Sequence, residues 1–292
     1  MDLNIRRLMK ISVFIVKNAC ECVPLKVIRR YKEKSTMKIA IVFDGLQIGG
    51  IERVGADYAR ILSELGHDVT VVNLVPNLKE MEKEFPKDCK WIGFNYPRRI
   101  VTEQYAQLVK KGFWGTACYL VAMLVMPVIS YTLKRKFKMI YHDSEEFDLT
   151  IAFSGHFNDL DFVSREFIKS KKKMCWLHGA LYSDFLISYG YMRLYEKIKN
   201  LIVLVDDAQE EALSYNKNLK LNIHKLYNPT FIKNREINCA HVEELKQKYG
   251  KFVLMVSRFE YPHKDQYTVA KMLDIVRKKY HEDLDLVFVG DG

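Results

Sequence analysis

The chain has 292 residues, 49% of them apolar, which is enough for one large or two ordinary domains with a substantial core. Its six cysteines are scattered, and the close pair Cys20 and Cys22 lacks the two-residue gap of a zinc or redox motif, so we expect reduced cytosolic thiols. The 46 Lys and Arg outnumber the 36 Asp and Glu, which is compatible with nucleic acid, anionic lipid or phosphorylated small molecules as partners. Since the sequence has no RNP-like segment, zinc finger or basic heptad helix, we expect no nucleic-acid partner.

Residues 1–36 form a basic N-terminal extension with a short apolar stretch. Lys10 interrupts the apolar part, and the uncharged core "ISVFIV" is short for a signal peptide, so secretion is not expected. Two interpretations remain open for this extension: an amphipathic helix that lies on a membrane surface, and a plain surface segment.

Apolar strand-like runs alternate with helical patterns from residue 37 onward. Strands are predicted at 38–44, 68–75, 90–96, 148–155, 173–179, 201–207 and 223–229. Most of these runs are continuously apolar, as are strands buried on both faces of a parallel sheet. The predicted fold class is therefore α/β, with one Rossmann-like parallel-sheet domain over residues 37–233.

Residues 238–292 are predicted to begin a second Rossmann-like domain. The pattern indicates helices at 238–250 and 264–280 and strands at 251–259 and 284–292. Two strands cannot bury both faces of a sheet, so we expect that this second domain is truncated or that a partner completes it.

The segment 113–133 carries no charge and is long enough to cross a bilayer. However, strands of one predicted sheet lie before and after it, and basic residues flank both of its ends, which does not favour a span. We predict one or two apolar helices that touch the lipid surface, with a break near Pro127. A wholly buried helix and a true span remain the alternatives.

A glycine-rich loop follows the first predicted strand. After Asp44, the loop places Gly49 and Gly50 at the start of a helix that contains Glu52. Its spacing fits neither the dinucleotide fingerprint nor the P-loop. Two interpretations stay open: a ligand approaches the backbone at the helix start, or the glycines only make a tight turn.

Three further motifs follow predicted strands. Arg258 and Lys264 lie six residues apart after the first strand of the second domain, where two cations suit a diphosphate. His178 follows the fifth strand and is itself followed by glycine, while Asn228 precedes a proline at the domain exit. Taken singly, each motif has a structural alternative: a solvated surface pair, a histidine that only donates a hydrogen bond, and a turn.

The order of these motifs resembles the family 4 retaining glycosyltransferases of the GT-B fold. The most specific parts are "GGIERV", "YNP", "SRFEYPHKD" and "VFVGDG", and the resemblance covers residues 37–292. It is strongest for bacterial members that build capsular or other cell-surface polysaccharide. Ser257 stands where the family usually has glycine.

The resemblance implies two Rossmann-like domains that face each other across a cleft, a nucleoside-diphosphate sugar as donor, and a lipid-linked or saccharide acceptor. Arg258 and Lys264 are implied to neutralise the diphosphate, and His178 to contact the donor sugar. Substrate contacts are assigned by the same resemblance to Gly49, Gly50, Glu52, Asn228 and Gly290.

The resemblance also implies that no metal or other cofactor is needed, and we name no general base. The two Asp-x-Asp triplets, Asp159–Asp161 and Asp283–Asp285, are expected to be surface acids. The expected location is cytoplasmic, peripheral on the inner face of the bacterial plasma membrane. The alternatives are an inactive remnant or partner subunit that binds acceptor or membrane, and a nucleotide-sugar epimerase.

Overall fold

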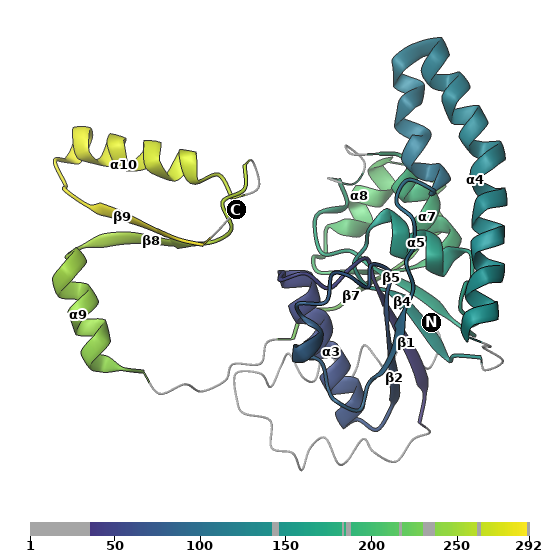
Figure 1. Ribbon diagram of the computed structural model, residues 1–292. Helices are drawn as coiled ribbons and strands as arrows, with labels where there is room; N and C mark the ends of the chain where they lie inside the picture. The colour runs from purple at the N-terminus through teal and green to yellow at the C-terminus, as the bar shows by residue number, and fades with distance from the viewer. Residues whose placement is uncertain are drawn as a thin grey trace. The chain divides into compact units, whose positions relative to one another are not determined.

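The computed structural model describes residues 36–141, 146–182, 184, 188–215, 218–229, 237–261 and 264–290. Residues 1–35 lie outside this description, and with them the two interpretations of the N-terminal extension. The chain divides into two compact units, Met1–Phe231 (unit 1) and Ile232–Gly292 (unit 2), each a body of its own (Figure 1).

Unit 1 is built on a seven-stranded parallel sheet in the order β3-β2-β1-β4-β5-β6-β7. The strands are β1 Lys38–Phe43, β2 Asp68–Asn73, β3 Lys90–Gly93, β4 Leu149–Ala152, β5 Lys173–Trp176, β6 Asn200–Val203 and β7 Asn222–Lys225. All seven predicted strands and the α/β class are confirmed. The observed strands end one to four residues earlier than predicted.

Helices cover both faces of this sheet. They are α3 Gly50–Glu64, α4 Gly112–Tyr141, α5 Phe157–Ser164, α7 Gly190–Ile198 and α8 Ala208–Tyr215, with 3₁₀ segments η1 Glu82–Glu84 and η2 Thr102–Lys111. Successive residues of β1 alternate between two apolar clusters: Ile41 packs with α3 on one face, and Val42 packs with α4, α5 and α7 on the other. Both faces are therefore buried, as the continuously apolar strands predict.

The strand order reverses between β1 and β4. The chain leaves β1 toward β2 and β3 on one side and returns through β4 on the other, and β1 and β4 pair in parallel from Ile39 with Leu149 to Val42 with Ala152. In open α/β sheets, ligands bind beyond the carboxyl ends of the strands at such a reversal. The topology thus indicates that a ligand site would lie at the edge of the sheet formed by the residues after β1 and β4.

The apolar segment predicted at 113–133 lies in one continuous helix, α4, with Pro127 inside it. The predicted break near Pro127 is wrong, because Met126 and Ile129 on either side of the proline both pack on the core and keep the two halves in line. The wholly buried alternative is also wrong: only 17% of the apolar window is buried. The stretch Thr102–Tyr141 is, by length and composition, long and apolar enough to cross a membrane.

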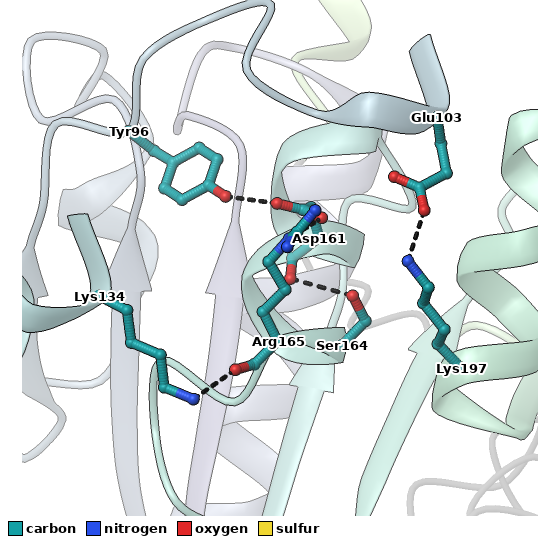
Figure 2. A network of polar contacts seen from close by, with 7 residues as sticks. All are labelled: Tyr96, Glu103, Lys134, Asp161, Ser164, Arg165 and Lys197. Carbon is teal, nitrogen blue, oxygen red and sulfur yellow. Dashed lines mark hydrogen bonds and ion pairs between the residues drawn. The ribbon is translucent and has the colours of Figure 1, made fainter. Parts of the chain in front are cut away.

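The acids of the first Asp-x-Asp triplet are not on the surface. Asp159 and Asp161 are both fully buried on α5, so this expectation is wrong. Asp161 accepts from the Tyr96 hydroxyl at 2.6 Å and from Arg165 Nε at 2.7 Å, as Figure 2 shows. Burial raises the pKa of Asp161, and the Arg165 guanidinium opposes that shift. The second triplet is exposed, as expected, with the Asp283 side chain 94% accessible.

The network around Asp161 joins several elements of unit 1 (Figure 2). Lys134 of α4 donates to the Arg165 carbonyl at 2.6 Å, and Lys197 of α7 pairs with the buried Glu103 of η2. These contacts fix α4 and η2 to the helices that pack on the sheet.

Unit 2 is a two-stranded parallel sheet with two helices. Its elements are α9 Cys239–Tyr249, β8 Phe252–Val256, α10 Gln266–Tyr280 and β9 Asp285–Val289, which confirms the elements predicted there. Both helices begin at side-chain caps, where Asn238 accepts from the His241 N–H and Asp265 from the Thr268 N–H. Leu273 is the one buried apolar side chain among the described residues of unit 2.

Candidate functional site

A polar cluster lies where the strand order reverses. Asp44 directly follows β1, and its backbone N–H donates to the Ser154 hydroxyl, beyond β4, at 2.9 Å. Its carboxylate accepts from Asn158 Nδ2 at 2.9 Å and lies 3.5 Å from Nδ1 of His156. Asp44 therefore connects the segment that follows β4 to the end of β1. Proteins of this fold class bind ligands at this position.

Asp159 hydrogen-bonds to the backbone of the segment that follows β4. Its carboxylate accepts from the N–H of Gly155 at 2.9 Å and from the N–H of His156 at 2.7 Å. Gly155 has φ +68°, and a Cβ there would lie 2.5 Å from the Trp176 carbonyl oxygen, so the turn requires glycine. Burial raises the pKa of Asp159 to about 7. The result is a fixed turn that carries His156 at its end.

The two histidines of the cluster have opposite pKa shifts. The Asp44 carboxylate raises the pKa of His156, whose side chain is 51% exposed. Burial lowers the pKa of His178 to about 4. Nε2 of His178 lies 2.7 Å from the Phe153 carbonyl and must carry the proton, because a carbonyl only accepts. The cluster thus combines one histidine favoured as a cation with one held neutral.

The glycine loop opens toward solvent at the same edge. A Cβ added to Gly50 would meet nothing within 4 Å, whereas one added to Gly49 would lie 2.3 Å from Oε2 of Glu52. The Glu52 carboxylate therefore folds back over the start of α3, where the helix favours negative charge. Glu52 also contributes to the raised pKa of His156. Glu52 and His178 thus each lie near His156, and the predicted role of Gly49, Glu52 and His178 in substrate binding stays a prediction.

Asn228 lies after β7. Its side-chain oxygen is buried and has no hydrogen-bond partner among the described residues. The preceding residue is held tightly: the Tyr227 carbonyl accepts from the Tyr58 hydroxyl of α3 at 2.6 Å. Asn228 therefore follows a segment that is attached to the helix of the glycine loop.

The other predicted site residues lie in unit 2. Gly290 has φ +150°, and a Cβ there would lie 2.0 Å from the Ser257 carbonyl oxygen, so the end of β9 approaches the segment after β8 as only glycine allows. Arg258 is exposed and pairs with Glu260 at 3.3 Å. The Lys264 backbone N–H donates to the Glu260 carbonyl at 2.8 Å, so the backbone at Lys264 lies beside the residue whose carboxylate pairs with Arg258.

Sequence reasoning missed three residues of the cluster in unit 1: Asp44, His156 and Asp159. A usable signal was present, because "SGHFND" places an acid three residues after a histidine at a predicted strand end, which is the spacing of a helix N-terminus whose third residue binds back to the cap. Within the described ranges, no three His, Cys, Asp or Glu side chains are placed to share a metal ion.

No protein-family model matches the sequence, and no curated protein matches it. A glycosyltransferase from Rickettsia africae is 16% identical over 88% of this chain and 61% of its own, with a TM-score of 0.49. HepE from Anabaena, solved in complex with UDP-glucose, is 14% identical over 87% of this chain and 69% of its own, with a TM-score of 0.47. An alpha-glucosyltransferase solved with UDP-glucose and DNA is 13% identical over 84% and 55%, with a TM-score of 0.42. This chain thus spans 61% of the length of the first of these structures and 55% of the third.

Proposed function

We propose that this chain belongs to a glycosyltransferase that moves a sugar from a nucleoside-diphosphate sugar to a lipid-linked or saccharide acceptor, with retention of configuration, in the synthesis of a cell-surface polysaccharide. The observation that carries this function is the histidine pair where the strand order reverses. His156, with its raised pKa, offers an N–H donor. His178 uses Nε2 on the Phe153 carbonyl, which leaves Nδ1 as an acceptor.

One donor and one acceptor in the same cluster match the chemistry of a sugar hydroxyl, which both donates and accepts. Sites that separate the protonation states of two neighbouring groups assign them different tasks. The neighbouring start of α3 adds backbone N–H groups that suit a phosphate or a hydroxyl oxygen. In the ligand-bound state, Glu52 would move from its position over Gly49 and accept from the substrate instead.

Transfer with retention follows from attack on the face from which the diphosphate departs. The acceptor oxygen bonds to the anomeric carbon, the bond to the diphosphate oxygen breaks with its electron pair, and the hydroxyl proton passes to that departing oxygen. The largest requirement is therefore stabilisation of the leaving diphosphate. We assign that task to Arg258 and Lys264, with His156 and His178 orienting the sugar and Asp44 and Asp159 positioning His156.

The experiment is a transfer assay with a panel of labelled nucleoside-diphosphate sugars and lipid-linked acceptors. We expect His156→Gln and Asp44→Asn to lower kcat/KM at least tenfold, which corresponds to about 1.4 kcal/mol. His67→Gln is the matched control, because it makes the same change at a half-buried histidine that precedes β2, at the edge of the sheet opposite the cluster. Equal losses in all three variants would refute a role of this cluster in transfer.

A second set of variants tests unit 2. We expect Arg258→Ala and Lys264→Ala each to lower turnover at least tenfold, because one charged hydrogen bond contributes about 1.5–3 kcal/mol. Lys278→Ala is the control, since this exposed lysine pairs with Asp274 of its own helix at 2.7 Å. Unchanged turnover in both site variants would remove the diphosphate assignment.

A second candidate is a subunit that binds acceptor or membrane without transferring sugar. It is favoured by the small core of unit 2, where the β8 side chains of Leu254 and Val256 are 53% and 69% exposed. The same sugar panel separates the two functions. Binding of the acceptor without turnover of any donor would support the subunit, whereas turnover of donor with acceptor present supports the enzyme.

A further inference from the structure

The segment before β4 forms a helical hairpin. η2 and α4 pack against each other, and Figure 1 shows their turn at the end of the hairpin that is far from the sheet. Gly112 makes the turn with φ +79°. A Cβ on Gly115 would lie 1.9 Å from the Leu108 carbonyl oxygen, so the two limbs approach more closely than any other residue allows. The tip is therefore a defined structure.

Two aromatic side chains and two lysines occupy this tip. Phe113 and Trp114 are each 78% exposed, and their rings contact each other with centroids 5.5 Å apart. Lys110 and Lys111 directly precede the turn and are exposed. Trp beside Lys is the composition found at the boundary between lipid headgroups and acyl chains.

α4 presents an apolar stripe along its outer side. Tyr119 and Ala122 are buried against the protein. The large apolar side chains that remain exposed are Leu120 55%, Val121 59%, Met123 44%, Leu124 76%, Val125 44%, Val128 62% and Tyr131 61%. An exposed apolar surface of this extent on one helix marks an interaction site.

Basic residues lie at both ends of the stripe, and no acid lies within it. Beyond Lys110 and Lys111 at the tip, the far end carries exposed Arg135, Lys136 and Lys138. No Asp or Glu occurs from Gln104 to Tyr141. This charge pattern is complementary to an anionic surface and unfavourable for a second copy of the same helix, which would bring like charges together.

We propose that the η2–α4 hairpin is a docking surface for an anionic phospholipid bilayer, with α4 lying along the interface. The helix has 30 residues and is therefore about 45 Å long, with basic residues at both ends. An upright helix would carry one basic end through the hydrocarbon, whereas a helix that lies flat leaves both ends among the headgroups. β3 and β4, which flank the hairpin, belong to one sheet, which also excludes a single crossing.

The test is flotation of the full chain with vesicles of phosphatidylglycerol and phosphatidylethanolamine, against vesicles of phosphatidylcholine alone. We expect binding to the anionic vesicles and release by high salt. Lys110→Gln with Lys111→Gln lowers the vesicle affinity about 30-fold, because each lysine near an anionic surface contributes a factor of roughly five. Phe113→Ser with Trp114→Ser lowers it at least about tenfold.

The matched controls are in unit 2: Lys278→Gln with Lys279→Gln, and Ile275→Ser with Tyr280→Ser, which alter exposed basic and apolar side chains of α10. We expect both controls to bind as the unaltered chain does. Four results would each overturn the proposal. Two are equal losses of binding in the control and hairpin variants, and equal binding to both kinds of vesicle. The others are extraction from the vesicles only by detergent, and self-association that depends on Phe113. The assay contains no sugar, so its failure and the failure of glycosyl transfer are separate results.

Discussion

The neutral state of His178 predicts a measurable dependence of stability on pH. Its pKa is lowered from 6.5 to about 4 by burial beneath the cluster. In the unfolded chain this side chain is protonated below about pH 6.5, whereas in the native chain it is protonated only below about pH 4. The native pKa is the lower one, so the free energy of unfolding must fall as the pH falls through this window.

The magnitude follows from the shift. A difference of about 2.5 pKa units at about 1.36 kcal/mol per unit gives a loss of about 3 kcal/mol between pH 7 and pH 4. His178→Gln removes the titration and keeps an N–H donor for the Phe153 carbonyl, which the ring nitrogen contacts at 2.7 Å. Near pH 7 the free energy of unfolding of the variant should therefore be no higher than that of the unaltered chain. Between pH 7 and pH 4 the difference should change by about 3 kcal/mol in favour of the variant.

The assay is urea unfolding of both proteins across this range, followed by circular dichroism and tryptophan fluorescence. Burial raises the pKa of Asp159 to about 7 and of Asp184 to about 6. Each of these acids contributes stability that is lost as the pH rises through its native pKa, which is the opposite direction. Both are present in both proteins, so they cancel in the difference between variant and parent. A difference that stays constant from pH 7 to pH 4 would refute a buried, neutral His178.

Three further predictions concern packing. Gly55→Ala should lower the free energy of unfolding by about 1–3 kcal/mol, because the added Cβ would lie 2.4 Å from the ring of Phe43. Gly50→Ala, whose added Cβ meets nothing within 4 Å, is the control in the same denaturation experiment. Tyr96→Phe should cost about 1.5–3 kcal/mol by removing the hydroxyl donor to the buried Asp161 carboxylate, and an unchanged midpoint would contradict this. Gly290→Ala should open the end of the β8–β9 pair, seen as faster hydrogen exchange at the Ser257 amide, which donates to the Val289 carbonyl at 3.0 Å; equal exchange in both proteins would exclude strain there.

Local apolar pattern was sufficient to predict the strands of both units and the two helices of unit 2. Runs such as 38–44 and 201–207 are apolar on both faces, and this property depends only on the sequence and on the two-sided burial of a parallel sheet. The strand order was not predicted, because the reversal depends on the pairing of β1 with β4, whose residues lie more than a hundred positions apart, and local pattern does not show that pairing.

The burial of Asp161 could not be predicted from local pattern. Asp161 is tolerated in the core because Arg165, four residues later, and Tyr96, from a distant segment, both hydrogen-bond to it. Only the first of these partners is close in sequence. Pro127 gives a similar case, since packing of the neighbouring residues keeps the helix continuous against the local preference of proline. The local pattern "SGHFND" could have indicated His156, but its pairing with Asp44 joins residues more than a hundred positions apart and is not visible in that pattern.

The hydrogen bond from Tyr58 to the Tyr227 carbonyl has a mechanical consequence. Tyr58 belongs to α3, whose first turn forms the glycine loop, and Tyr227 lies shortly before Pro229, the last described residue of unit 1. A force that acts along the chain at Tyr227 is therefore borne by α3 as well as by β7. The glycine loop and the segment by which the chain leaves the sheet are therefore mechanically connected, and tension on one is transmitted to the other.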